Sequence, residues 1–443
     1  MKRCIGWLGF LALCGPLLGD CGSALGRMTA SPPESRPASA PSPDAAATRS
    51  TRWGEDLTAL VDGLRTKHKN AFFKTSQAEF EKAAESVRAR LDRLQDHQII
   101  VEFMKLGAML GDGHSGLDYG GVQPPFRAFP FAIMAFNDGV YIIAATEPHK
   151  DLIGKRIVRV GSVPADEAIE RVSAVFAYEN ESWRKHSLRR FINIAEVLHA
   201  VGVIDDTERT SLTVMDDQKR ETAAELTPLK PGERPAFITY RSSITEKPPL
   251  SLEGRQQWYW FQSLPEEHAI YCRYDRCADQ PGTTVKQFGD RLLAHIDGED
   301  APHLIVDLRN NGGGNSALFD PVIAALKHKQ SKGTLGRTIV LIGRATFSSG
   351  QLNAASLRRE LGATVIGEPT GQKPNAYGEV RTFKLPHSGL TVSYSTKLFH
   401  TDPTDRPSMM PDVAVDATAA DLFANRDRAF EKALEMLKAE GAE

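Results

Sequence analysis

The sequence predicts an α/β protein in which a helical unit and a β-rich segment precede a mostly parallel sheet. Three observations lead to this prediction. Apolar runs at 304–308, 339–342 and 364–366 alternate with helical stretches at 317–327 and 351–361, as strands joined by crossover helices do. Residues 53–111 carry apolar side chains at helical spacing, and short strand-like runs follow between residues 129 and 160.

Charge and motif content exclude several classes of function. The 443 residues include 54 Lys+Arg and 56 Asp+Glu, and this balance gives no surplus of positive charge for nucleic acid or an anionic membrane. Neither a His-Glu-x-x-His zinc motif nor a Gly-x-x-x-x-Gly-Lys-Ser/Thr phosphate loop occurs. Cys272 and Cys277 have no second pair with which to form a zinc site. We therefore expect no nucleic-acid partner, no metal and no cofactor.

Residues 1–26 have the pattern of a signal peptide. Lys2 and Arg3 precede an apolar run from residue 5 to 19 and then small residues. This pattern predicts export, in a bacterium to the periplasm or cell envelope. Cys21 leaves a lipid anchor as the alternative to a free exported form, although Asp20 stands where lipoprotein sites carry a small residue. Residues 27–52, rich in Pro, Ser and Ala, predict a disordered linker.

Three domains are predicted beyond the linker. Residues 53–118 form an N-terminal helical unit, in which Ser76 and Glu79 make a capping box. Residues 119–250 form a β-rich segment, whose order of strands and helix around 152–172 resembles a PDZ module. Residues 251–443 form the α/β core, where sites gather at the carboxyl ends of the strands.

Two segments of the core offer a nucleophile and donors for an oxyanion. Ser348 lies between the strand at 339–342 and the helix that begins near residue 351, so the next amide, that of Ser349, is free to donate. Gly313 and Gly314 belong to the run Asp-Leu-Arg-Asn-Asn-Gly-Gly-Gly-Asn after the strand at 304–308, where bare backbone N–H groups face an anion without hindrance. The structural alternatives are a helix N-cap for Ser348 and a tight turn for the glycines.

Two residues are candidates for the base that activates the serine. His114 stands in Asp-Gly-His-Ser-Gly at the end of the helical unit, and a neutral imidazole is the usual base for a hydroxyl. Lys373 follows Gly-Glu-Pro-Thr-Gly-Gln after the strand at 364–366, and a lysine acts as a base when burial lowers its pKa. The alternatives are a loop histidine in solvent and a solvated loop cation.

Together, these four segments resemble the tail-specific, or C-terminal processing, serine proteases and their tricorn-core relatives. The resemblance covers residues 301–416 most fully and extends loosely back to Trp53. It implies a spiral ββα core of the ClpP or crotonase kind, and cleavage of peptide bonds in polypeptide substrates through an acyl-enzyme.

The resemblance offers two ways to activate the serine. Tail-specific proteases use a Ser-Lys dyad, which Ser348 and Lys373 match, whereas tricorn-like members use a histidine together with an acidic residue near the final strand. His114 matches that histidine, and Asp405, ahead of Pro411-Asp412, stands where those relatives carry glutamate. Asp402 is the competitor. We favour His114, because imidazole titrates near neutrality whereas the neighbours of Lys373 offer little apolar burial.

Other functions remain open from the sequence alone. The same fold serves a retinoid carrier, interphotoreceptor retinoid-binding protein, so a non-catalytic peptide-binding or lipid-binding protein is one alternative. A crotonase-type acyl-CoA enzyme is another, although an exported chain would not meet cytosolic CoA substrates. Retention of a serine, a base and glycine donors together favours the peptidase.

Overall fold

A computed structural model describes residues 43–254, 256–300 and 302–440. The predicted signal peptide lies outside these residues, and so does the predicted linker as far as residue 42. Helix α1, Pro43–Lys67, begins within that linker, so residues 43–52 are helical where the sequence predicted disorder. Contacts with distant residues account for the difference, because the Arg49 guanidinium donates to the Leu94 carbonyl at 2.9 Å and binds the Asp96 carboxylate.

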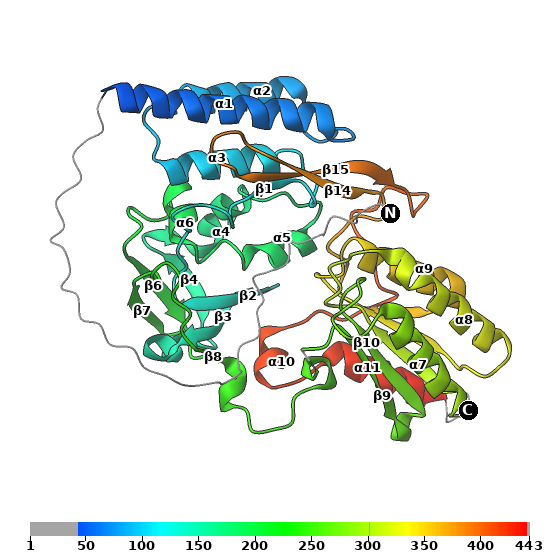
Figure 1. Ribbon diagram of the computed structural model, residues 1–443. Coiled ribbons are helices and arrows are strands. Elements are labelled where there is room, and N and C mark those ends of the chain that lie inside the picture. Colours follow the sequence, from blue (N-terminus) through cyan, green and yellow to red (C-terminus); the bar gives the residue numbers. More distant parts are fainter. Residues whose placement is uncertain (1–42, 255, 301, 441–443) are drawn as a thin grey trace, which may run out of the picture.

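The helical unit consists of α1, α2 (Gln77–Arg88) and α3 (Asp96–Ala108), which lie together at the top of Figure 1. The predicted capping box is confirmed, since the Ser76 side chain accepts the Glu79 N–H and the Glu79 side chain accepts the Ser76 N–H. The helices pack through fully buried side chains such as Leu57, Leu60 and Phe103. From α3 the chain passes into the loop that carries His114.

The β-rich segment forms one antiparallel sheet beside this unit. Its strands lie in the order β2 (Phe131–Phe136), β3 (Gly139–Thr146), β4 (Arg156–Val160), β6 (Thr210–Met215) and β7 (Glu221–Leu226), with β5 (Val163–Pro164) on β4 and β8 (Phe237–Thr239) on β3. Its helices are α4 (Ala165–Ser173), α5 (Glu181–Leu188) and α6 (Ala195–Ala200). Sheet and helical unit share one hydrophobic core, and α6 packs against α3.

The predicted mostly parallel sheet is confirmed in the C-terminal half. Its order is β16 (Val413–Ala414), β13 (Thr364–Gly367), β12 (Thr338–Ile342), β11 (His303–Asp307), β10 (Ala269–Tyr274) and β9 (Tyr259–Leu264), and only the edge strand β9 is antiparallel to its neighbour. Helices α7 (Val285–Asp297), α8 (Asp320–Ser331) and α9 (Ser349–Leu361) cover one face, and α11 (Arg428–Glu440) covers the other. Burial on both faces explains the continuous apolar runs of these strands.

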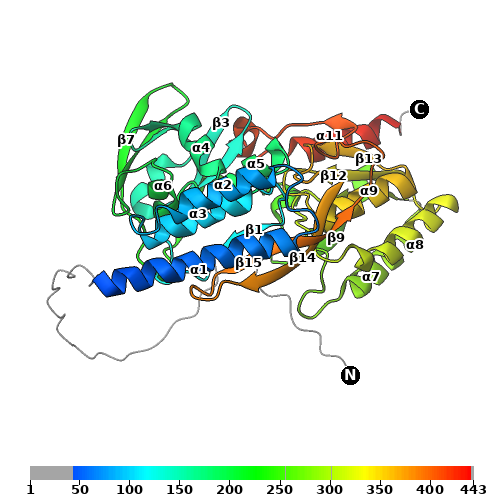
Figure 2. The ribbon, with the colours of Figure 1, turned by 90° about the horizontal axis from the view of Figure 1, so that it is seen from above.

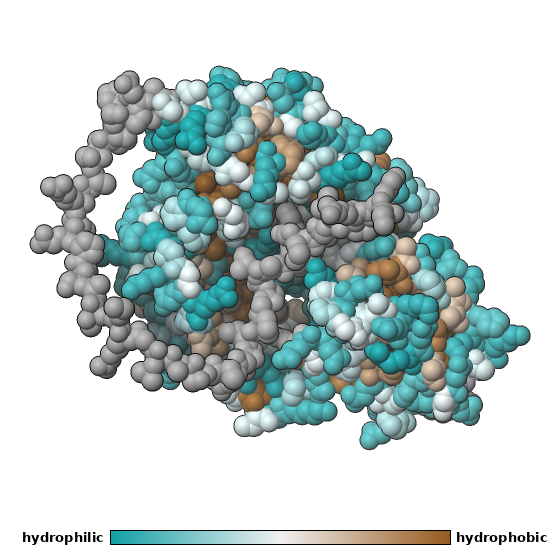
Figure 3. Space-filling view, viewed as in Figure 1, coloured by the Kyte–Doolittle hydropathy of each residue, from teal (hydrophilic) through white to brown (hydrophobic). Residues whose placement is uncertain are grey.

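Short elements complete the chain. They are the helix α10 (Ala419–Phe423) and 3-10 turns at Glu147–Leu152, Tyr240–Ser243, Leu250–Leu252, Pro265–Glu267 and Ser316–Leu318. Within the described ranges no helix is both long enough and apolar enough to cross a bilayer. Figure 3 shows hydrophobic residues in small separate patches among hydrophilic ones on the face in view.

A long hairpin joins the two halves of the molecule. Strands β14 (Ala376–Lys384) and β15 (Thr391–Phe399) leave the region of the parallel sheet and return to the helical unit, where β15 pairs with β1 (Gly116–Asp118) (Figures 1 and 2). Gly378 lies so close to the histidine loop that a Cβ on it would be 3.9 Å from His114 Cε1. The hairpin thereby brings the histidine loop beside the C-terminal half.

Candidate active site

Ser348 occupies a strained turn between β12 and α9. Its backbone angles are φ 51° and ψ −130°, a conformation that favours glycine, and it is half-buried. The Ser348 N–H donates to Gln372 Oε1 at 2.5 Å. The side chain does not cap α9, and its hydroxyl has no hydrogen-bond partner in the part of the chain that the structure describes. Ser348 therefore holds the N-cap position of α9 without capping it through its side chain, which leaves the hydroxyl unbonded.

Gly313 lies directly against Ser348. A Cβ on Gly313 would be 2.6 Å from Ser348 Cβ, 3.1 Å from its Oγ and 3.1 Å from the Ser349 nitrogen. Asn311 sets this approach, since its backbone oxygen accepts the Phe347 N–H at 2.9 Å and its Oδ1 accepts the Gly313 N–H at 2.9 Å. The glycine run and the serine turn predicted from sequence thus form one site.

Two backbone amides at this site are free to hold an oxyanion. The Ser349 N–H is at the first position of α9, where no intrahelical acceptor exists, and neither it nor the Gly314 N–H donates to any other described residue. The Ser349 hydroxyl donates to the Gly314 carbonyl at 2.7 Å and holds the two segments together. Of the predicted donors, Ser349 and Gly314 are therefore available, whereas the Gly313 amide is engaged by Asn311.

The glycine triplet provides a matched test of this geometry. We expect Gly313→Ala to lower kcat/KM by roughly 10²-fold or more, because its φ of 109° is unfavourable for alanine and the new methyl would displace Ser348. Gly312→Ala is the control, since a Cβ there meets nothing within 4 Å. Steady-state kinetics of the two variants measure the difference. Equal activity of both would contradict the close approach of Gly313 to Ser348.

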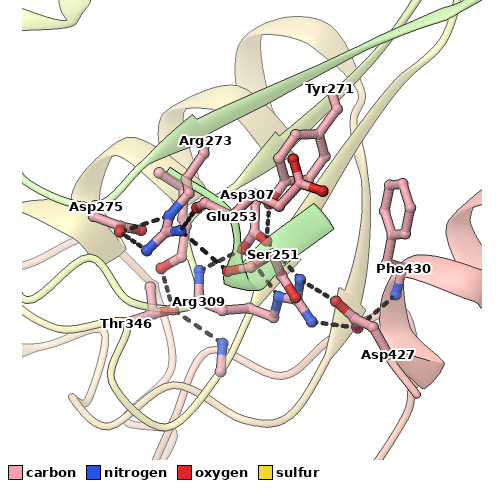
Figure 4. A network of polar contacts seen from close by, with 12 residues as sticks. Ser251, Glu253, Tyr271, Arg273, Asp275, Asp307, Arg309, Thr346, Asp427 and Phe430 are labelled. Carbon is pink, nitrogen blue, oxygen red and sulfur yellow. Dashed lines mark hydrogen bonds and ion pairs between the residues drawn. The ribbon is translucent and has the colours of Figure 1, made fainter. Parts of the chain in front are cut away.

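A buried ionic network around Arg309 lies directly before the glycine run in the sequence (Figure 4). Arg309 binds the Asp307 carboxylate through Nε at 2.9 Å and Nη2 at 2.6 Å, and binds Asp427, just before α11, through Nη1 at 2.6 Å. Although burial opposes it, these two carboxylates raise the pKa of the Arg309 guanidinium above its ordinary value. The Thr346 hydroxyl donates to the Leu308 carbonyl at 2.8 Å. The network fixes the serine turn and the glycine run against the sheet.

His114 lies beside the serine turn rather than in solvent. Its side chain is 11% exposed, and its ring packs on that of Phe347 with centroids 4.6 Å apart. Phe347 in turn stacks on Trp183 at 4.0 Å. Neither nitrogen of the buried imidazole has a hydrogen-bond partner among the described residues. The imidazole is therefore held by ring packing next to the residue that precedes Ser348, with both nitrogens unengaged.

Asp112 is an ionised carboxylate beside this imidazole. Its Oδ1 lies 3.7 Å from His114 Nδ1, and its Oδ2 accepts hydrogen bonds from Ser115 Oγ at 2.5 Å and Ser395 Oγ at 2.6 Å. Although burial opposes it, the facing His114 ring and the hydrogen bonds from His68 and Ser115 lower the pKa of Asp112 well below its usual range. A permanent negative charge therefore faces the ring.

Glu179, which the sequence analysis missed, is the second carboxylate at this point. It stands two residues before α5, and its oxygens accept the Gly113 N–H at 3.3 Å and the Lys373 N–H at 2.9 Å. Burial, and then the charge of Asp112, raise the pKa of Glu179 to about 7. No motif marks this position, because its partners lie far away in the sequence.

Asp112, His114 and Glu179 each place one potential ligand atom within 4.8 Å of the others. Both oxygens of each carboxylate already accept hydrogen bonds from the protein. These bonds leave fewer lone pairs on the two carboxylates for a cation.

Lys373 and Asp405 form an ion pair on the surface. The Lys373 Nζ lies 2.8 Å from Asp405 Oδ1, and the Asp405 side chain is 69% exposed. The expected hydrogen bond between Asp405 and His114 is absent, since the carboxylate is turned to the nearby ammonium. Asp402 does not replace it, because its Oδ1 accepts the Thr404 N–H at 2.8 Å within a local turn. The structure thus groups His114 with Asp112 and Glu179 instead.

A cavity of about 230 Å³ adjoins this group. It is lined by apolar and charged side chains alike: Phe73, Glu179, Lys373, Asn375, Ala376, Tyr377, Leu398, His400 and Asp405. Glu179 both lines the cavity and bonds to the histidine loop, so the cavity lies beside that loop.

Comparison with solved structures identifies the fold. The chain matches mature CPAF with a TM-score of 0.61 at 13% identity, over 88% of this chain and 96% of that one. A serine-to-alanine mutant of CPAF matches equally, with a TM-score of 0.61 at 14% identity over 88% and 96% of the two chains. A photosystem II D1 C-terminal processing protease matches with a TM-score of 0.39 at 14% identity, over 83% and 93%. No protein-family model and no curated protein matches the chain.

At this level of identity the likeness to CPAF establishes the architecture. It extends over most of both chains and therefore includes the helical unit, the antiparallel sheet and the parallel sheet together. The chain has the mixed α/β fold of mature CPAF, and the predicted resemblance to the tail-specific processing proteases is confirmed as a likeness of fold.

Proposed function

We propose that this chain is a serine endopeptidase that hydrolyses polypeptides through an acyl-enzyme on Ser348. The observation that carries the proposal is the unbonded Ser348 hydroxyl on its strained turn, with Gly313 packed against it and the Ser349 and Gly314 amides free. A carrier protein has no need of a backbone strained by about 1–3 kcal/mol to present a hydroxyl beside two unengaged donors. The motifs and the fold support the same conclusion.

In the proposed mechanism, Ser348 Oγ attacks the scissile carbonyl carbon while His114 accepts the hydroxyl proton. The carbonyl oxygen becomes an oxyanion that accepts hydrogen bonds from the Ser349 and Gly314 amides, each worth about 10²- to 10³-fold in rate. The imidazolium then donates its proton to the leaving amine, and water hydrolyses the ester by the same route in reverse. Asp112 stabilises the imidazolium across 3.7 Å.

In the structure neither His114 nitrogen bonds to the serine hydroxyl. Such contacts are commonly long in free enzymes and shorten when substrate binds. The proposal therefore includes a small approach of the histidine loop to Ser348 in the substrate complex.

Hydrolysis of casein by the purified protein, with a fluorophosphonate probe as a second measurement, tests the function. The wild type is expected to cleave casein and to carry the probe on Ser348, identified by mass spectrometry of the labelled peptide. A protein that binds peptides without cleaving them or taking up the probe would instead be the non-catalytic carrier.

The proposal extends to architecture and location. We infer that the parallel sheet and its helices form the ClpP or crotonase type of spiral core, and that the antiparallel sheet is the PDZ-like module. We also infer that residues 1–26 direct export, with a lipid on Cys21 as the alternative. The N-terminal mass of the mature protein from cells decides between these two exported forms, and full-length cytosolic protein would contradict export.

A further inference from the structure

The Glu179 side chain connects the histidine loop to the loop that contains Gln372 and Lys373. Gln372 in turn binds the backbone of Ser348. Glu179 accepts the N–H of Gly113, the neighbour of His114, at 3.3 Å. Its other oxygen accepts the N–H of Lys373 at 2.9 Å. The residue before Lys373 is Gln372, whose side chain accepts the Ser348 N–H at 2.5 Å. A single carboxylate thus bridges the backbones on both sides of the candidate site.

The residues that follow Glu179 strengthen this bridge. Asn180 Nδ2 donates to the Thr370 carbonyl at 3.1 Å and to Ser408 Oγ at 2.8 Å. Trp183 stacks on Phe347, against which the His114 ring is packed. The segment from 179 to 183, which enters α5 of the β-rich part, therefore contacts the histidine loop, the serine turn and the loop at 370–373.

Six titratable groups lie beside the Glu179 carboxyl or around the cavity that it lines. Asp112 and His114 face it from the loop after α3, with ligand atoms within 4.8 Å. Lys373, Tyr377, His400 and Asp405 line the same cavity from the C-terminal half, and Lys373 is paired with Asp405. Among these carboxylates, Glu179 is the one that both lies within 4.8 Å of a His114 ring nitrogen and lines the cavity.

We propose that Glu179 is a positioning residue that sets the distance and orientation of His114 relative to Ser348. This inference rests on the proposed function, since it assigns a role within that reaction. Two carboxylate oxygens are needed because two N–H donors arrive from opposite sides. A glutamine has the same size but only one oxygen, so its NH₂ group would face one of the N–H donors and release one loop.

The test compares Glu179→Gln with Glu181→Gln. Glu181 is the matched control, because it lies two residues away on α5, is largely exposed and, within the described ranges, forms an ion pair with Arg184 alone. We expect Glu179→Gln to lower kcat/KM about 10- to 100-fold, mainly through kcat, as the loss of an orienting contact does. Glu181→Gln is expected to stay within about twofold of wild type. Glu179→Asp, which keeps both oxygens, is expected to recover part of the loss.

The pH profile separates positioning from a merely structural role. Glu179 is partly ionised near pH 7, so removing its carboxylate from beside the imidazolium should move the acidic midpoint of kcat/KM to lower pH in Glu179→Gln. A purely structural defect would lower activity at every pH alike and leave the midpoint in place. An unchanged midpoint, or activity equal to that of Glu181→Gln, would overturn the inference while casein cleavage by the wild type still supported the function.

Thermal unfolding gives a readout that needs no activity. The pKa of Glu179 is raised from 4.5 to about 7, so the folded state binds the proton more tightly and this group stabilises the fold fully below pH 4.5. That contribution falls as pH rises to about 7 and is absent in Glu179→Gln. The Tm of the wild type minus that of the variant should therefore decrease across this window. A constant difference, or a failure of Glu179→Asp as well as Glu179→Gln to fold, would count against a positioning role.

Discussion

Replacing Ser348 with alanine is expected to lower kcat about 10⁴- to 10⁶-fold, the loss seen when a serine nucleophile is removed from an acyl-transfer site. Folding should be unaffected, because the Ser348 hydroxyl makes no hydrogen bond to another described residue and its removal leaves no buried group unpaired. We expect the free energy of unfolding to change by less than about 0.5 kcal/mol. Casein turnover and denaturant unfolding of the same preparation measure both quantities.

Ser356→Ala is the control for this substitution. Ser356 lies on the same helix, α9, and among the described residues its hydroxyl accepts a hydrogen bond from Arg359 alone, at 3.4 Å. It should retain wild-type turnover and fluorophosphonate labelling, whereas Ser348→Ala should lose both. Undiminished labelling of Ser348→Ala would show that another residue is the nucleophile and would remove the basis of the proposed function.

Replacing His114 with alanine is expected to lower kcat about 10³- to 10⁴-fold or more, because the serine would lose the group that takes its proton. Lys373→Met is expected to remain within about fivefold of wild type, since the pair between Lys373 and Asp405 lies at the surface and such pairs contribute little. Parallel kinetics of the two variants at neutral pH separate the histidine mechanism from the Ser-Lys dyad.

A larger loss of activity in Lys373→Met than in His114→Ala would establish the Ser-Lys dyad. An inactive Lys373→Met together with a fully active His114→Ala would mean that the ion pair opens and that the amine reaches Ser348. His400→Ala is a suitable control for the histidine substitution, because His400 lines the cavity but is not part of the proposed mechanism. It should leave kcat near the wild-type value.

Much of the core was predictable from the sequence for a physical reason. Continuous Val, Ile and Leu runs at 304–308 and 339–342 identify strands buried on both faces, and the carboxyl ends of parallel strands meet at one edge. That rule alone places the glycine run beside Ser348. The free Ser349 amide also follows from local structure, because the first residues of any helix lack acceptors.

The polar surroundings of His114 were not predictable in this way. The carboxylates near the imidazole are Asp112 and Glu179, and Glu179 is bonded to partners on either side of it in the sequence, at 113 and 373. The resemblance pointed instead to Asp405, which the fold turns toward Lys373. Such contacts depend on how loops from separate sheets meet, and no periodicity or local spacing encodes that.

The division of the site between the histidine loop after α3 and the serine turn before α9 has a consequence for biosynthesis. While the ribosome is still making the chain, the His114 imidazole emerges long before the Ser348 hydroxyl that it is to deprotonate. Under the proposed function, the nascent polypeptide is incapable of cutting itself or its neighbours until the hairpin β14–β15 has been made and has closed onto the helices. A nick that allowed the N-terminal and C-terminal fragments to drift apart would likewise extinguish hydrolysis.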